Sequence, residues 1–367
     1  MPVPEEEKYN LREPSKKRRN PKENKPADFG NCAFRCRFPK RRNKTSGTLD
    51  LYVAIPKLKR SIFRDRGLRA ADNLKLVYGI NIMERGAWKM KCEVCFRHCE
   101  LEEGQTGFCR ARRCSGGRIR PLNYGELTAL GLDPVEKKPL RRFFPGSMIL
   151  SCGSYGCNLA CDFCQNYEIS MAEEGSVQTE TYMPERLAEL AEALVPQGNI
   201  GIAFTYNEPL VGYEYVRDTA KLAREKGLKT VLVTNGTAEI PVLEEILPFM
   251  DAMNIDLKGF TEEYYSRNCR GSLNQVKMFI ERACRDCHVE LTTLIVPSKN
   301  DSEEEMEQEA AWIASLNGGS GKEIPLHVTR FFPRYHMTDF SPTPVETVYR
   351  LAETARKKLK YVYTGNC

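Results

Sequence analysis

Three cysteines lie within eight residues in the stretch GCNLACDFCQN, which runs from Gly156 to Asn166. Cys157, Cys161 and Cys164 follow a C-x3-C-x2-C spacing. A cuboidal [4Fe–4S] cluster has four irons that each need one external ligand, so three thiolates leave one iron open to a substrate or cofactor. A tetrahedral zinc ion would also accept three thiolates and a water molecule. The spacing therefore predicts a metal centre with one free coordination position.

A second group of cysteines lies upstream, in KCEVCFRHCELEEGQTGFC. Cys92, Cys95, Cys99 and Cys109 are spaced C-x2-C-x3-C-x9-C. Four thiolates can close a structural zinc site, or they can hold a second [4Fe–4S] cluster that relays electrons. Zinc ribbons usually contain two CxxC pairs and this segment contains one, while ferredoxins use other intervals. Both metals therefore stay open for this predicted site.

The composition indicates a cytoplasmic globular protein. Hydrophobic residues make up 41% and charged residues 28% of the 367 positions. We find no apolar run long enough to span a membrane, and the first residues lack the apolar core of a secretory signal. In a reducing cytosol, 15 mostly clustered cysteines indicate metal ligands rather than disulfides.

Charge divides the chain into a basic front and a mildly acidic remainder. Residues 1–69 hold 20 Lys and Arg against 8 Asp and Glu, a balance of +12, whereas the whole chain carries only +6. We expect residues 1–82 to form a basic, disordered extension, residues 83–145 a cysteine-rich metal-binding module, and residues 146–367 a catalytic barrel. The basic run has no interleaved aromatic residues or nucleic-acid motif, so we predict no nucleic-acid partner.

From residue 148 onward, strand-like and helix-like segments alternate. Short apolar runs predict strands at 148–154, 201–206, 229–235, 252–258, 289–296, 325–332 and 361–364. Amphipathic patterns predict helices at 184–195, 211–227, 240–249, 273–284, 303–316 and 345–359. This alternation is typical of parallel βα units. It predicts an α/β fold with a partial (β/α)6 TIM-type barrel.

Polar residues follow several of these predicted strands at their carboxyl ends. Glu208, Asn235, Asp256 and Lys258 occupy such positions, and the first predicted strand leads directly into the cysteine loop. Because chemistry in barrels of this type is located at the carboxyl ends of the strands, we expect these side chains to surround the predicted metal centre.

These motifs, in this order, resemble those of the radical S-adenosylmethionine (radical SAM) superfamily. The C-x3-C-x2-C loop, with the aromatic Phe163 before its last cysteine, is similar to the cluster-binding loop of that family. The segment TYNEP, residues 205–209, resembles the family's GGEP-like segment, whose Glu contacts the amino group of SAM. Glu208 is the matching residue, whereas Tyr206 and Asn207 replace the two glycines.

Two more strand ends carry the resemblance. VTNG, residues 233–236, and NIDLK, residues 254–258, follow as the family's motifs do, and IDLK is similar to the DLK of glycyl-radical activating enzymes. The resemblance implies that Lys258 meets the carboxylate of SAM and that Asp256 lies near the same site. It also implies that Asn235 belongs to the cofactor site.

Further motifs narrow the resemblance. VPSKND, residues 296–301, resembles the VPG-x-x-D turn of the activating enzymes with Ser298 in place of Gly, and PRYHM, residues 333–337, resembles their PYH segment and makes His336 a further candidate. The cysteine loop followed by YEIS, the segment PLHVTRFFP and the upstream cysteines resemble the radical SAM enzyme of the AmmeMemoRadiSam system. That family is grouped with the pyruvate-formate-lyase-activating enzymes.

The resemblance implies a [4Fe–4S] cluster whose open iron binds SAM, and reductive cleavage of SAM to a 5′-deoxyadenosyl radical that abstracts hydrogen. The implied partners are SAM, a flavodoxin- or ferredoxin-type reductant and a glycyl-radical enzyme as protein substrate, in an anaerobic setting. One alternative is radical modification of a small molecule or another protein in an AmmeMemoRadiSam-type system. A zinc-binding interaction protein is the alternative from a different functional class.

Overall fold

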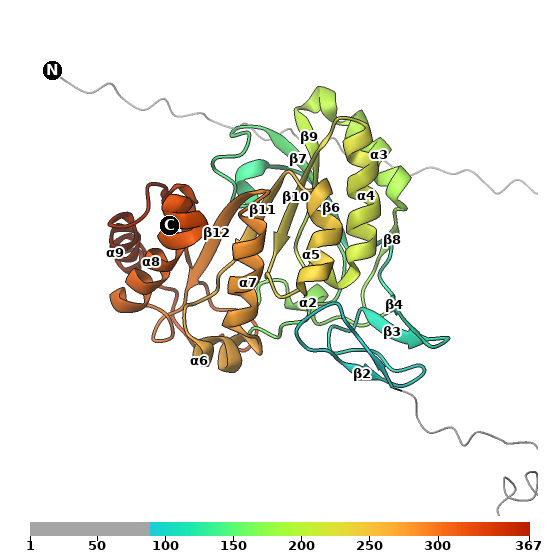
Figure 1. Ribbon diagram of the computed structural model, residues 1–367, viewed down its shortest axis with the longest axis horizontal. Helices are drawn as coiled ribbons and strands as arrows, with labels where there is room; N and C mark the ends of the chain where they lie inside the picture. The colour runs from blue at the N-terminus through green and yellow to red at the C-terminus, as the bar shows by residue number, and fades with distance from the viewer. Residues whose placement is uncertain (1–88) are drawn as a thin grey trace, which may run out of the picture. The chain divides into compact units, whose positions relative to one another are not determined.

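A computed structural model describes residues 89–367. The predicted basic extension, residues 1–82, lies outside the described residues. An eight-stranded sheet forms the centre of the described part (Figure 1), and its strands are ordered β14-β13-β12-β11-β10-β9-β7-β6. The strands are β6 (Ala129–Pro134), β7 (Met148–Gly153), β9 (Asn199–Phe204), β10 (Lys229–Thr234), β11 (Ala252–Asp256), β12 (His288–Ile295), β13 (Leu326–Arg330) and β14 (Val362–Gly365).

In this sheet, β7 and the strands β9 to β14 run parallel to one another. The predicted α/β fold with a parallel sheet is confirmed. In the part of the chain that the structure describes, the edge strands β14 and β6 are not paired with each other, so the barrel is partial and open.

The strand β6 was not predicted. It runs antiparallel to β7 and pairs Leu130 with Cys152, although it belongs to the segment that the sequence analysis assigns to the cysteine-rich module. Its sequence, ALGLDP, contains Gly131 and ends in Pro134, which both weaken a strand pattern. The strand forms because the outer edge of β7 would otherwise leave its backbone donors and acceptors unpaired.

Helices follow one another along the sheet, as Figure 1 shows for α3, α4, α5, α7, α8 and α9. The helices are α2 (Tyr167–Ser170), α3 (Pro184–Ala193), α4 (Tyr213–Glu225), α5 (Ile240–Ile246), α6 (Glu262–Tyr264), α7 (Leu273–Ala283), α8 (Glu303–Gly319) and α9 (Val345–Arg356). Short 3-10 turns are η1 (Val135–Lys137), η2 (Val195–Gln197), η3 (Pro209–Gly212), η4 (Leu247–Phe249) and η6 (Ser320–Glu323), and η5 (Tyr265–Cys269) is a π-turn.

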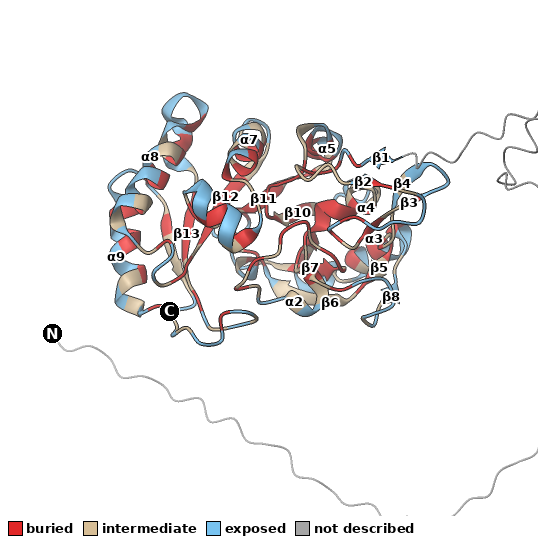
Figure 2. Ribbon diagram, turned by 90° about the horizontal axis from the view of Figure 1, so that it is seen from below, coloured by how far each residue is buried: buried red, intermediate tan, exposed pale blue. Residues whose placement is uncertain are grey.

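The helices are amphipathic and bury one face against the sheet. Figure 2 shows this as buried residues toward the strands and exposed residues on the outer surface of α5, α7 and α8. Within residues 89–367, no helix combines the length and the apolar character needed to cross a membrane.

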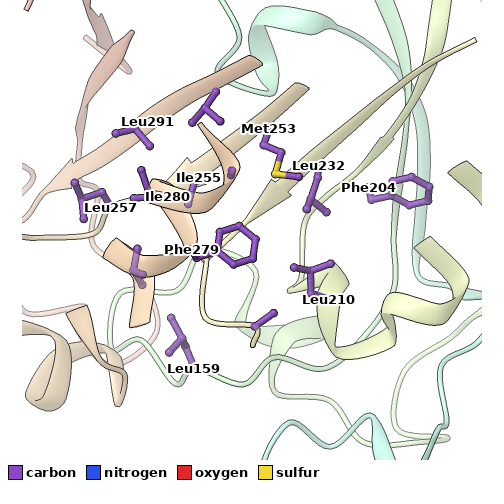
Figure 3. Packing of buried hydrophobic residues seen from close by; sticks show 14 of the residues in the cluster. Leu159, Phe204, Leu210, Leu232, Met253, Ile255, Leu257, Phe279, Ile280 and Leu291 are labelled. Carbon is purple, nitrogen blue, oxygen red and sulfur yellow. The ribbon is translucent and has the colours of Figure 1, made fainter. Parts of the chain in front are cut away.

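The main hydrophobic core lies between these helices and the strands. Figure 3 shows Phe279 and Ile280 of α7 among side chains of β10 and β11, including Leu232 and Ile255. Leu159, from the cysteine loop, belongs to the same cluster and is 1% exposed. Burying one such side chain contributes about 1.5–3 kcal/mol. The cysteine loop is therefore anchored in the core rather than laid on the surface.

The upstream cysteines lie on a small module of short strands that packs at the end of β10. The short strands of the described part are β1 (Met90–Lys91), β2 (Glu100–Leu101), β3 (Arg112–Ser115), β4 (Arg118–Pro121), β5 (Glu126–Leu127) and β8 (Glu180–Thr181). Cys95 forms an isolated antiparallel bridge with Ala238, and the amide of Glu239 donates to the carbonyl of Val94 at 3.0 Å. Backbone pairing therefore fixes the module beside the residues that follow β10.

Candidate active site

A cavity of about 570 Å³ lies at the carboxyl ends of the strands. Its volume is within the usual range of small-molecule sites, roughly 300–1,000 Å³. The sequence-predicted residues that line it are Cys157, Cys161, Cys164, Glu208, Asn235, Asp256 and Lys258. His336, the remaining candidate for this site, is exposed and is not among the lining residues.

The cysteine loop is held on two sides. Leu159 and Phe163 are buried in the core, so the residues between the three cysteines anchor the loop. On the other side, the amide of Ala160 donates to the carbonyl of Cys269 at 3.0 Å, and the amide of Asp162 donates to that of Asn268 at 3.0 Å. The three thiols are thus presented to the cavity from a fixed backbone.

Cys269 is a neighbour that the sequence analysis did not predict. It ends the π-turn η5, is fully buried, and its thiol hydrogen-bonds with that of Cys161. This hydrogen bond, together with burial, raises the pKa of Cys161 well above its ordinary value. Burial and the nearby Glu208 and Cys161 raise the pKa of Cys157 likewise. The thiols therefore hold their protons in the metal-free protein, and metal binding must displace them.

Two amide groups lie close to the sulfur of Cys157. The side-chain Nδ2 of Asn235 lies 3.7 Å from that sulfur, and the backbone amide of Leu159 donates to it at 3.4 Å. The same Nδ2 also donates to the Oδ1 atom of Asn158 at 2.9 Å, which fixes the orientation of Asn235. Hydrogen bonds to a metal-bound sulfur stabilise its negative charge and tune the metal.

Glu208 is a buried residue that follows β9 and immediately precedes η3. It accepts hydrogen bonds from the hydroxyl of Thr234 at 2.7 Å, from the amide of Asn235 at 2.7 Å and from the amide of Leu210 at 3.1 Å. Burial raises the pKa of Glu208 to about 7, although these three hydrogen bonds oppose the shift. A cationic group in the cavity would favour the ionised carboxylate, so Glu208 is suited to bind an ammonium ion.

Lys258 contributes a positive charge to the lining of the same cavity. Its Nζ lies 2.7 Å from Oδ2 of Asp256. Burial alone would lower the pKa of Lys258, but Asp256 and the nearby thiols of Cys161 and Cys269 outweigh it and raise that pKa. The hydroxyl of Tyr265 accepts from the backbone amide of Lys258 at 2.9 Å. A fixed ammonium group of this kind is suited to bind a carboxylate.

Two positions depart from the glycines of the family motifs and keep a glycine-like backbone. Tyr206 has a φ of +74° and Ser298 a φ of +62°. A left-handed conformation costs a residue with a Cβ atom about 1–2 kcal/mol. The Tyr206 hydroxyl donates to Oδ2 of Asp133 at 2.8 Å, and its carbonyl accepts from Asn166 at 2.7 Å. At Tyr206, these two contacts offset the strain of the left-handed conformation.

The floor of the cavity carries a carboxylate–histidine pair that the sequence analysis also missed. His327 lines the cavity, and its Nε2 lies 2.7 Å from Oε2 of Glu290. Glu290 is fully buried and accepts from the amides of Arg141 and Arg142 at 2.9 and 2.7 Å. Although burial opposes ionisation, the hydrogen bonds from His288, His327 and these amides lower the pKa of Glu290 to about 2. His327 belongs to the segment PLHVTRFFP quoted above, but nothing in that segment connects it with Glu290.

The donor set fits a cluster with an open position and a zwitterionic ligand beside it. Three thiols line the cavity together with the acidic Glu208 and the basic Lys258. Within the described residues 89–367, no three His, Cys, Asp or Glu side chains stand close enough to share a single metal ion. Thiolates of a cuboidal cluster bind separate irons and need no such convergence. Cys92, Cys95, Cys99 and Cys109 do not line this cavity but lie next to it.

Comparisons with known proteins agree with this geometry. The family model described as the radical SAM superfamily matches residues 152–313. The chain is 39% identical over 280 residues to the uncharacterized protein MJ0808 of Methanocaldococcus jannaschii, covering 76% of this chain and 81% of that protein. It is 26% identical over 218 residues to the putative glycyl-radical enzyme activating enzyme MJ1227 of the same organism, covering 57% and 83%. It is 24% identical over 152 residues to the pyruvate formate-lyase 1-activating enzyme of Escherichia coli K12, covering 41% and 61%.

Proposed function

Because the chain belongs to the radical SAM superfamily, we propose that its cavity binds a [4Fe–4S] cluster and SAM and that the protein cleaves SAM reductively. One observation carries this proposal: Cys157, Cys161 and Cys164 share a single cavity with the carboxylate of Glu208 and the ammonium of Lys258. Three thiols would hold the cluster, and the two charged groups match the amino and carboxylate ends of SAM.

Held by Cys157, Cys161 and Cys164, a cluster would supply the electron for splitting SAM into methionine and a 5′-deoxyadenosyl radical, and that radical would remove a hydrogen atom from a substrate C–H bond. The protein's part is to position the reactants and to exclude water. Glu208 binds the amino group of SAM, and its buried carboxylate loses its proton as the ammonium arrives. Lys258 binds the carboxylate of SAM, while Asp256 keeps the lysine side chain in place at 2.7 Å.

For the hydrogen donor, we propose a glycyl-radical enzyme. The similarity to activating enzymes supports this choice. The cavity is also lined from both edges of the open sheet, by residues 136–139 and Arg141 after β6 and by residues 364–366 at the end of β14. A sheet that stays open leaves room for a loop of a macromolecular substrate.

The cleavage reaction is tested on protein reconstituted with iron and sulfide without oxygen. Dithionite and SAM are added, and 5′-deoxyadenosine and methionine are quantified. We expect both products in equal amounts, a loss of both in Cys161→Ala, and normal amounts in Cys287→Ala, a cysteine outside the cavity lining. Neither product from a protein that holds at least about four irons would contradict the proposal.

The choice of hydrogen donor needs its own experiment. A glycyl-radical enzyme such as pyruvate formate-lyase is incubated with the reduced protein and SAM, and the mixture is frozen for electron paramagnetic resonance. A glycyl radical signal that depends on SAM supports the proposal. Formation of 5′-deoxyadenosine without that signal would favour a small molecule or another protein as the donor.

The upstream cysteines extend the proposal. We propose that Cys92, Cys95, Cys99 and Cys109 bind a second metal centre, and that the physiological electron donor is of the flavodoxin or ferredoxin type. Cys92, Cys95 and Cys109 are buried and Cys99 is partly buried, as is typical of metal ligands in a small module.

A further inference from the structure

The two cysteine segments are in direct backbone contact. A Cβ atom at Gly156 would lie 2.6 Å from the carbonyl oxygen of Cys109 and 2.7 Å from the Cβ of Ala111. Gly156 immediately precedes Cys157, the first cysteine of the cavity. The backbone of Cys109 therefore packs against Gly156, and the residue after Gly156 is Cys157.

A side chain also connects the two groups. Asn158 lies within hydrogen-bond reach of the Cys95 thiol. Its Nδ2 donates to the hydroxyl of Thr237 at 2.8 Å, and its Oδ1 accepts from Asn235, which in turn contacts Cys157. Asn158 is 1% exposed, so this link is shielded from water. Two side chains, those of Asn158 and Asn235, therefore connect the upstream thiol of Cys95 with the thiol of Cys157.

Arg97 lies among thiols of both groups. Its Nε donates to the carbonyl of Asn158 at 2.5 Å, and its Nη2 donates to that of Arg270. The guanidinium is close enough to Cys95, Cys99, Cys109 and Cys157 to interact with each electrostatically. A cation in this position would stabilise the negative charge of two neighbouring thiolate centres.

Arg112 supplies a second, independent observation. It is 4% exposed, it pairs with Glu214 at 2.6 Å, and it lies near the thiols of Cys92 and Cys109. Its Nε is buried and has no hydrogen-bond partner among the residues that the structure describes. A buried donor without a partner costs free energy, and a metal-bound sulfur would supply an acceptor.

The position of the upstream thiols favours an iron–sulfur cluster over a zinc ion. A zinc ion has no redox chemistry and could only hold the module together, whereas a cluster beside Cys157 could pass an electron to the first cluster. Arg97 and Arg112 lie near these thiols, and both cations would stabilise the added negative charge of a reduced cluster.

We infer that Cys92, Cys95, Cys99 and Cys109 hold a second iron–sulfur cluster, which passes electrons to the cluster at Cys157, Cys161 and Cys164. A low-potential one-electron donor of the flavodoxin or ferredoxin class is oxidised by one electron at the second cluster. That electron then reduces the first cluster, and no proton or atom is transferred. The inference rests on the proposed function, because the first cluster is where the electron is used.

Metal content tests the second cluster without any assay of activity. Protein reconstituted under anaerobic conditions is analysed for iron, sulfide and zinc, and the iron–sulfur signals are recorded by electron paramagnetic resonance. We expect about eight irons and eight sulfides per chain in the wild type and about four of each in Cys95→Ala/Cys99→Ala, since each cuboidal cluster holds four irons. Cys114→Ala is the matched control, because Cys114 is buried in the same module but contacts Glu103 instead. About four irons and one zinc in the wild type would overturn the inference.

Electron transfer is tested by the rate of 5′-deoxyadenosine formation with two donors. Dithionite is small and can reach either cluster, whereas reduced flavodoxin must dock at the surface. We expect the ratio of the flavodoxin-driven to the dithionite-driven rate to fall at least about tenfold in the double variant and to stay unchanged in Cys114→Ala. An unchanged ratio in the double variant would overturn the relay. A wild type with about eight irons that forms no 5′-deoxyadenosine with either donor would contradict the proposed function, and redox titration of the two signals would still test the transfer.

If the double variant fails to fold, Arg97→Ala gives a second test that keeps every cysteine. Its metal content should equal that of the wild type. The reduction of the first cluster by flavodoxin should slow relative to its reduction by dithionite, because the cation between the two groups is lost. A wild-type ratio in this variant, with both clusters present, would count against the relay.

Discussion

The carbonyl oxygen of Cys109 lies 2.6 Å from the position that a Cβ atom would occupy at Gly156. The backbone of Gly156 also has a φ of +89°, a conformation that residues with side chains rarely adopt. Two features of one glycine thus permit the two cysteine segments to touch. The contact places the upstream cysteines beside the first cysteine of the cavity.

Replacement of Gly156 by alanine should therefore separate the two segments or unfold the module. We expect Gly156→Ala to lower the free energy of unfolding by roughly 2–4 kcal/mol, because backbone strain and a clash with a carbonyl oxygen both contribute. Chemical denaturation measures this change. Gly175→Ala is the matched control, since Gly175 has a φ of +75° but an added Cβ would meet nothing within 4 Å. Equal losses in both variants would show that the Cys109 contact contributes nothing.

The binding of SAM should depend on pH through Glu208. The pKa of Glu208 is raised to about 7 by burial in the ligand-free protein, so its carboxyl group is increasingly protonated as the pH falls below that value. Its titratable neighbours are Asp256 and Cys157. Since an ammonium needs the ionised carboxylate, we expect affinity for SAM to fall up to about tenfold for each pH unit below 7.

Calorimetric titrations with SAM from pH 6 to 8 measure this dependence. Glu208→Gln serves as the comparison, because any titration of SAM itself affects both proteins equally. The variant should bind SAM more weakly at pH 8 and lose the part of the pH dependence that belongs to Glu208. Parallel pH profiles for the two proteins would rule out ionisation of Glu208 as the cause.

Removal of the positive charge at Lys258 should weaken SAM binding. We expect Lys258→Met to raise the dissociation constant for SAM roughly ten- to hundredfold, since hydrogen bonds to charged groups contribute about 1.5–3 kcal/mol. The variant also leaves Asp256 without its partner at 2.7 Å. Lys299→Met, which removes a charge from an exposed position, is the control. Wild-type affinity in Lys258→Met would show that this lysine does not bind SAM.

Glu290 should stabilise the cavity floor in a pH-dependent way. Hydrogen bonds from His288, His327 and two backbone amides outweigh burial and lower the pKa of Glu290 to about 2. A carboxyl group with a lowered pKa stabilises the fold above its unfolded pKa of about 4.5, and this contribution is lost as the pH falls toward 2. We expect Glu290→Gln to reduce the free energy of unfolding at pH 7 by about 3 kcal/mol.

Thermal unfolding of wild type and Glu290→Gln at pH 7 and pH 4 measures this effect. The difference between the two proteins should shrink at the lower pH, where the wild-type carboxylate has begun to lose its advantage. Glu307→Gln, at an exposed position of α8, should match the wild type at both values. A difference that is the same at pH 4 and pH 7 would indicate a packing defect rather than an effect of charge.

Strand-end positions explain how much of the site was predictable. Glu208, Asn235 and Lys258 are far apart in the sequence, but each follows a parallel strand, and the carboxyl ends of such strands meet at one edge of the sheet. The alternation of strand and helix patterns was therefore sufficient to bring them together with Cys157. His336 lies on a loop after β13, where no strand end fixes its position, and the structure leaves it outside the cavity lining.

Other contacts had no signal in the sequence. Cys269 stands alone in a π-turn, so nothing in its spacing connects it with Cys161. The link from Arg97 to Asn158 joins residues 61 positions apart that belong to no common motif. Glu290 lies within β12, and only the folded chain shows that His327 of β13 lies beside it. Such interactions depend on tertiary packing, which local patterns do not encode.

The most direct test of the central claim is whether SAM reaches the cluster in the cavity between Glu208 and Lys258. The electron paramagnetic resonance spectrum of the dithionite-reduced Cys95→Ala/Cys99→Ala variant is recorded with and without SAM, so that only the first cluster contributes. We expect SAM to change the spectrum, and the further substitution Lys258→Met to require a much higher SAM concentration for the same change. Identical spectra with and without saturating SAM would contradict the account.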